Sequence, residues 1–211
     1  MRLNTLKAMA AITVGAACCS TVLYAATGPV KSQTTTEAAT PSVRDSMGSA
    51  GKGAQNPVAL NDAQILGVVV AVDENEVAAA GKAEKMKMGS EAMAYAKMLR
   101  EEHKADADKT KKLGKEIGAK PASSALAIQL KDNGKSELKA MSSKKGADFE
   151  KAYVDAMVNG HADVLKLIDE TLIPDAQNEA VKKHLAEVRG HVAMHLEQGK
   201  RLQGAQASKT E

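Results

Sequence analysis

The fold of this chain is decided by the stretch Phe149-Glu-Lys-Ala-Tyr-Val-Asp-Ala-Met-Val-Asn-Gly-His-Ala-Asp-Val-Leu-Lys-Leu-Ile168. Its large apolar residues and one histidine recur every three or four positions, at Phe149, Tyr153, Met157, His161, Val164 and Ile168. Side chains with this spacing share one face of an α-helix, and the charged residues between them form the opposite face. A helix of this kind buries its apolar stripe only against partner helices. The stretch therefore predicts a helical bundle with a histidine on an inward face.

The rest of the chain after residue 60 shows the same helical pattern. Helix formers with apolar spacing predict helices over 62–86, 90–117, 122–143, 149–172 and 176–203. We expect Asn61 or Asp62 to cap the first helix and Ser90 the second, and Asn133-Gly134 is a pair that can break the third helix in two. No stretch has enough period-two alternation to predict a strand. These features predict an all-α fold, an antiparallel four-helix bundle with an additional short connecting helix.

The first 26 residues have the features of a secretory signal peptide. Arg2 and Lys7 precede an apolar run that ends in small residues at Ala25-Ala26. We therefore expect export, to the periplasm of a bacterium, with cleavage favoured over a retained membrane anchor. Gly15-Ala-Ala-Cys18 also distantly resembles a lipoprotein signal, so membrane contact is expected only through an uncleaved or lipidated N-terminus.

The composition of the predicted mature chain excludes several functions. Both cysteines, Cys18 and Cys19, lie in the signal segment, which leaves no disulfide, thiolate or cysteine metal site. Removing Arg2 and Lys7 lowers the formal charge from +3 to +1, so the chain has no strong positive charge for binding phosphates. It also has few aromatic side chains on which bases could stack, with one Phe, three Tyr and no Trp. Nucleic acid is therefore not expected as a partner. Residues 27–60 have the composition of a disordered tether, 61–203 form the bundle domain and 204–211 a polar tail.

Polar residues interrupt the inward faces of the predicted helices. In a bundle with converging stripes, one interior layer would contain Glu76, His103, Asp106, His161 and His191. Glutamate and histidine from facing helices are how bundle cores hold metal ions, so the candidate metal ligands are Glu76, His103, His161 and His191. The alternative is that these histidines only form hydrogen bonds in the core, with Glu76 and His103 as a buried ion pair. We expect His184 to face solvent.

Methionine beside histidine is a second pattern in the chain. Met157 lies four residues before His161, and Met194 directly precedes His195. Thioether with imidazole suits Cu(I), but methionine also fills cores that are short of aromatic residues, and we favour core filling. No nucleophile–base pair, phosphate loop or His-Glu-x-x-His motif is present, so catalysis by side chains alone is not indicated.

Several short motifs in a fixed order connect the chain to a known family. They are Glu76 with Gly81, Met98-Leu-Arg-Glu-Glu-His103, Asp148-Phe-Glu-Lys-Ala-Tyr153 followed by Met157 and His161, and Leu185-Ala-Glu-Val-Arg-Gly-His191. With these motifs, residues 61–203 resemble the bacterial domain-of-unknown-function 4142 family. The resemblance implies an exported, ferritin-like bundle, and it marks Glu76, His103, His161 and His191 as recurring polar residues.

The resemblance does not extend to the Glu-x-x-His motif of ferritin-like di-iron sites. Arg100 stands three residues before His103, and Val188 stands three before His191. A di-metal oxidase is therefore the least favoured function. The leading hypothesis is an exported bundle that binds copper, iron or zinc in its core, and the alternative is a structural or envelope-stress interaction module.

Overall fold

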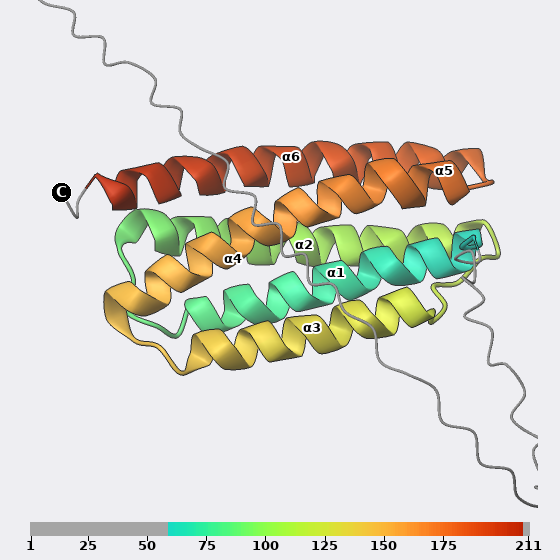
Figure 1. Cartoon of the computed structure of the whole chain (residues 1–211). Helices are drawn as coiled ribbons and strands as arrows, with labels where there is room; N and C mark the ends of the chain where they lie inside the picture. Colours follow the sequence, from blue (N-terminus) through green and yellow to red (C-terminus); the bar gives the residue numbers. More distant parts are fainter. Residues whose placement is uncertain (1–58, 209–211) are drawn as a thin grey trace, which may run out of the picture. The chain divides into compact units, whose positions relative to one another are not determined.

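The computed structural model describes residues 59–208, which form α-helices and connecting loops without a strand (Figure 1). The elements are α1 (Asp62–Ala83), α2 (Ser90–Glu116), α3 (Ala125–Ser142), α4 (Gly146–Leu167), the π-helical turn η1 (Ile168–Leu172), α5 (Ile173–Asp175) and α6 (Glu179–Ala207). The predicted all-α bundle is confirmed, and the ferritin-like arrangement stays a prediction. The predicted signal peptide and nearly all of the predicted tether lie outside the described residues.

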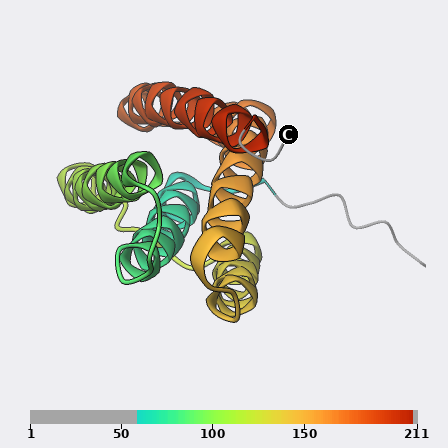
Figure 2. The ribbon, with the colours of Figure 1, turned by 90° about the vertical axis from the view of Figure 1, so that its left-hand side faces the viewer.

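The long helices form two antiparallel pairs that are joined by α3. Helix α1 packs against α2, and α4 packs against α6, while α6 also contacts α2. Helix α3 carries the chain back along α1 and contacts α4, so α2 and α4 run in the same direction (Figures 1 and 2). Within the part of the chain that is described, no helix is long and apolar enough to cross a membrane.

The helix ends differ from the predictions by a few residues. Asn61 caps α1 as expected, because its Oδ1 accepts from the Gln64 amide at 3.0 Å while the Gln64 side chain accepts from the Asn61 amide at 3.1 Å. The cap of α2 is Gly89, so Ser90 is its first helical residue and not its cap. Helix α6 continues to Ala207, beyond its predicted end at 203.

Asn133-Gly134 does not break α3, which is continuous from Ala125 to Ser142. A Cβ atom at Gly134 would lie 2.4 Å from the Asn75 side chain of α1, and Asn75 Nδ2 donates to the Leu130 carbonyl at 2.9 Å. The glycine therefore allows α1 and α3 to approach closely, which explains why a residue with low helix propensity stands inside this helix.

The buried apolar residues form two clusters, one toward each end of the bundle. On each of α2, α4 and α6, a buried histidine lies between the part of the helix that packs in one cluster and the part that packs in the other. Asp73 of α1 is buried at the same level. A layer of polar side chains thus crosses the core between two apolar regions. Buried polar groups require partners, so the contacts in this layer are of special interest.

Candidate metal centre

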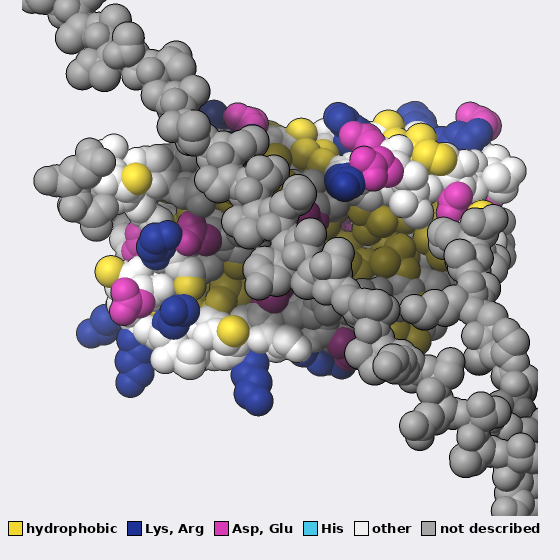
Figure 3. Space-filling view, in the orientation of Figure 1, with side chains coloured by type: hydrophobic (Ala, Val, Ile, Leu, Met, Phe, Trp, Pro, Cys, Tyr) yellow, Lys and Arg dark blue, Asp and Glu magenta, His cyan; other side chains and the backbone are white. Residues whose placement is uncertain are grey.

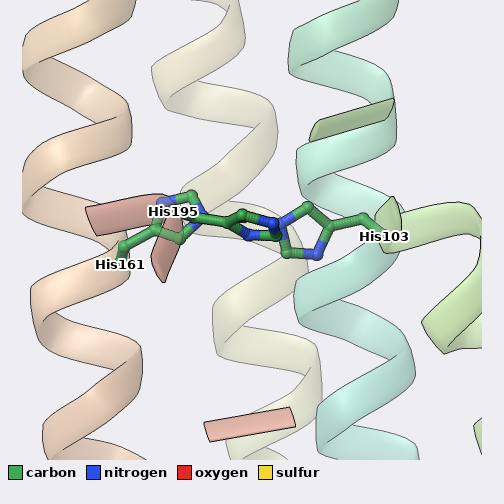
Figure 4. Close-up of side chains that lie close together, drawn as sticks. All are labelled: His103, His161 and His195. Atoms are coloured by element: carbon green, nitrogen blue, oxygen red, sulfur yellow. Dashed lines mark hydrogen bonds between the residues drawn. The ribbon is translucent and has the colours of Figure 1, made fainter. Parts of the chain in front are cut away.

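Three histidines from three helices converge in the polar layer of the core. His103 of α2, His161 of α4 and His195 of α6 are 2%, 1% and 0% exposed. One ring nitrogen of each lies within 4.8 Å of the others, and the ring centroids are 5.1 to 5.5 Å apart. Figure 4 shows the three rings pointing toward one another, and the outer face drawn in Figure 3 shows no histidine among the described residues.

Asp73 of α1 fixes the ring of His103. The distance from His103 Nδ1 to Asp73 Oδ1 is 2.9 Å, and both side chains are buried. Because a carboxylate accepts, Nδ1–H is the donor, and Nε2 is the nitrogen that faces the cluster. Burial alone would lower the pKa of His103, but the hydrogen bond to Asp73 and the charges of Glu76, Asp73 and Asp106 raise it above its ordinary value.

A backbone carbonyl fixes the ring of His161. His161 Nδ1 lies 2.7 Å from the carbonyl oxygen of Met157, one helical turn earlier, so Nδ1–H donates. The lone pair of Nε2 then points to His103, whose own Nε2 lies 3.4 Å away. Burial, and next the charge of His103, lower the pKa of His161 to about 3. His161 is therefore neutral at physiological pH.

Glu102 of α2 fixes the ring of His195. His195 Nε2 lies 2.7 Å from Glu102 Oε2, which makes Nε2–H the donor. The other nitrogen, Nδ1, is buried and has no hydrogen-bond partner. Burial lowers the pKa of His195 despite the Glu102 carboxylate, and the Tyr95 hydroxyl donates to the His195 backbone carbonyl at 2.9 Å, which connects α2 to α6 at this level.

Each ring thus uses one nitrogen to donate to a group outside the cluster, which leaves its other nitrogen available as a ligand. Metal-binding histidines have this arrangement, because an acceptor on the outer nitrogen sets the tautomer and the orientation of the ring. Two ligands on a tetrahedral zinc ion with bonds of 2.0–2.1 Å are about 3.3–3.4 Å apart, and the two Nε2 atoms of His103 and His161 are 3.4 Å apart. A proton on His103 Nε2 fits the same gap, as a hydrogen bond to His161.

The predicted site residue Glu76 lies next to the histidine cluster but outside the group of mutually close ligand atoms. It does not form the expected ion pair with His103, whose partner is Asp73. Burial, together with the charges of Asp73 and Glu137, raises the pKa of Glu76 to about 7 against the effect of His103. Its Oε2 atom is buried without a hydrogen-bond partner.

The predicted site residue His191 also lies outside the cluster. Its Nδ1 atom is 2.8 Å from Asp106 Oδ2, and its side chain is 44% exposed. Of the expected layer of Glu76, His103, Asp106, His161 and His191, the cluster therefore contains His103 and His161, and α6 contributes His195 to it in place of His191. The prediction that His184 faces solvent is wrong, since His184 is buried and its Nε2 lies 2.7 Å from the Thr110 hydroxyl.

Three residues of the site, Asp73, Glu102 and His195, were not among the predicted ligands, and Asp73 and His195 had a signal in the sequence. Both residues continue the spacing of the inward apolar residues on their helices, since Asp73 lies four residues after Val69 and His195 lies three after Val192. Of the two methionines beside histidines, Met157 packs in an apolar cluster, as core filling predicts, and Met194 is exposed.

The fold and these contacts define the chain as an all-α bundle protein with a buried cluster of three histidines. The chain belongs to the family of the domain of unknown function DUF4142, whose model matches residues 47–202, and the predicted family is thereby confirmed. No curated protein and no solved structure matches the chain.

Proposed function

We propose that this bundle binds one divalent transition-metal ion, zinc or copper, between His103, His161 and His195. The observation that carries the proposal is the orientation of the rings by Asp73, the Met157 carbonyl and Glu102. These three acceptors occupy one nitrogen of each ring, which leaves His103 Nε2, His161 Nε2 and His195 Nδ1 as the available ligand atoms, and one ring nitrogen of each histidine lies within 4.8 Å of the others.

The ligand set favours zinc or copper over iron. Neutral imidazole suits both zinc and copper, whereas non-haem iron sites commonly add a carboxylate to two histidines. Among residues 59–208, the group of mutually close ligand atoms contains no carboxylate oxygen. The same feature argues against the di-metal oxidase, whose bundle sites use several carboxylates.

Three protein ligands leave a fourth tetrahedral position for a small exogenous ligand. Structural zinc sites are closed by four protein ligands, and sites with an open position exchange or activate what binds there. We therefore assign the protein to metal handling and not to structural metal binding. The signal-like residues 1–26 support placing this function outside the cytoplasm, in the periplasm or at the cell envelope.

A second function is favoured by the hydrogen bonds themselves. Asp73, His103, His161 and the Met157 carbonyl form one continuous chain that is complete with a single proton between the two histidines. A polar layer of this kind gives a bundle a unique packing without any metal. The protein would then be a structural or interaction module of the cell envelope.

Metal analysis of the full chain, purified without a histidine tag, separates these two functions. We expect one zinc or copper ion per chain after equilibration with the metal and gel filtration, and retention of this ion in His191→Ala, which alters a histidine outside the cluster. The double variant His103→Ala, His161→Ala should lose the ion while circular dichroism reports an intact helical fold. If the wild-type chain retains no metal, the structural function is supported instead.

A further inference from the structure

A cavity between α1, α3 and α4 lies beside the histidine cluster. Its volume is about 290 Å³, and its wall includes Glu76 of α1 and Gly160 of α4, which directly precedes His161. A Cβ atom at Gly160 would lie 3.7 Å from Glu76 Oε1, so the carboxylate faces the backbone that carries His161. In Figure 4, the ribbons of α1 and α3 pass behind the imidazole rings and α4 runs beside them.

The charged residues of this cavity wall are all acidic. Its carboxylates are Glu76, Glu137 and Asp163. Two asparagines, two glycines and apolar side chains complete the wall, which within the described residues includes no lysine or arginine. By contrast, the wall of the cavity of about 260 Å³ between α2 and α6 has charges of both signs, from Lys109, Lys112, Lys183, Glu116 and Glu187. A cleft lined by one sign of charge concentrates ions of the opposite sign, so cations are favoured in the first cavity.

Glu76 connects the acidic cavity to the cluster. Its Oε2 atom is buried and has no hydrogen-bond partner, which is rare for a carboxylate oxygen. Its negative charge also acts on His103, whose pKa it raises. A carboxylate that lines the acidic cavity, has a free oxygen and is close enough to act on His103 offers a cation an intermediate ligand.

We propose that the cavity between α1, α3 and α4 is the route by which a divalent cation passes from solvent to the three histidines, with Glu76 as its last carboxylate contact. This inference rests on the proposed metal binding. In this route the ion approaches from the α1, α3 and α4 side of the bundle, and Glu76 transfers it to the histidines. The competing path runs past Glu102, whose side chain is 38% exposed and bonded to His195.

The test is the rate of Co(II) binding to the full chain, followed by stopped-flow absorption of the bound ion. Gly160→Met places a flexible side chain in the cavity, where the nearest atom to its Cβ is 3.7 Å away. Glu137→Gln with Asp163→Asn removes two charges from the wall without adding volume. The matched control for charge is Glu101→Gln with Asp108→Asn, which alters two exposed carboxylates of α2 outside the cavity wall.

We expect Gly160→Met to lower the association and dissociation rate constants by at least about tenfold each and to leave the affinity unchanged, because an obstructed path alters both directions equally. The neutralised wall should lower the association rate constant several-fold at low salt and less at high salt, with no effect in the control pair. Glu76→Gln should slow association without removing the bound spectrum.

The possible results separate the route from the metal site. Unchanged rate constants in both cavity variants, or slowing only in Glu102→Gln, would overturn the route and leave metal binding by the histidines intact. A wild-type chain that gives no spectrum of bound Co(II) would overturn the metal site and the route together. Should Gly160→Met fail to fold, the neutralised wall decides the question alone.

Discussion

The buried carboxyl of Glu76 makes the stability of the metal-free bundle depend on pH. Its pKa rises from an ordinary value of 4.5 to about 7, mainly because burial disfavours the charged form. One pKa unit corresponds to about 1.4 kcal/mol, so ionising Glu76 in the folded state costs about 3 kcal/mol. The folded state binds this proton more tightly than the unfolded state, so the stabilisation is complete below about pH 4.5. It is lost as the pH rises to about 7, the pKa in the folded state.

Glu76→Gln tests this reasoning, because glutamine has the shape of the protonated side chain and cannot ionise. We expect equal free energies of unfolding for the two chains near pH 4. At pH 8 the variant should be more stable by about 3 kcal/mol. Urea unfolding in the presence of a chelator, followed by circular dichroism at several pH values, measures the difference. Changes that are common to both chains, such as most of the titration of His103, cancel in this comparison.

An exposed residue serves as the matched control for this experiment. Glu101 of α2 is exposed, so Glu101→Gln should change the free energy of unfolding by less than about 0.5 kcal/mol at every pH. If the curves of the wild-type chain and Glu76→Gln stay parallel from pH 4 to pH 8, the carboxyl is not buried as described. That result would also remove Glu76 from the proposed route of the cation.

Three further predictions concern α6 and the histidine cluster. Gly199→Ala should destabilise the fold by about 1–3 kcal/mol in urea unfolding, since side chains of α2 and α4 lie 2.9 and 3.0 Å from the new methyl group. Gly190→Ala is the matched comparison: its methyl group meets nothing within 4 Å, so this variant should stabilise the fold by up to about 1 kcal/mol. Asp73→Asn should weaken zinc binding by about 10–100-fold in titration calorimetry, because it removes the charge that orients His103. In the Glu76→Gln background at pH 6, zinc binding should release about one proton, because of the three cluster histidines only His103 has a raised pKa, and its hydrogen bond to Asp73, the largest of the causes that raise it, remains in this variant. Calorimetry in buffers of different ionisation enthalpy counts the proton, and a value near three would contradict the lowered pKa values of His161 and His195.

Local spacing along the chain is enough to predict the helices and the inward faces of most of them. Helical periodicity is a local property, so the spacing from Phe149 to Ile168 predicts both the helix and the burial of His161, and the spacing around His103 does the same for α2. The ends of the helices are harder to predict, because a cap depends on the backbone geometry at a single residue. At the start of α2, for example, the cap is Gly89 and not the predicted Ser90.

Which histidines and acidic residues form the cluster depends on how the helices pack against one another. His191 and His195 are four residues apart, which places them only about 40° apart around the helix axis. Sequence spacing therefore left both near the inward face, and the packing of α6 against α2 and α4 turned His195 into the core and His191 to the rim. The choice of Asp73 over Glu76 as the partner of His103 has the same cause, because both acidic residues lie close to the inward face of α1. Which of two neighbouring side chains meets another helix depends on the rotation of each helix about its axis, and only the packing of the whole bundle sets that rotation.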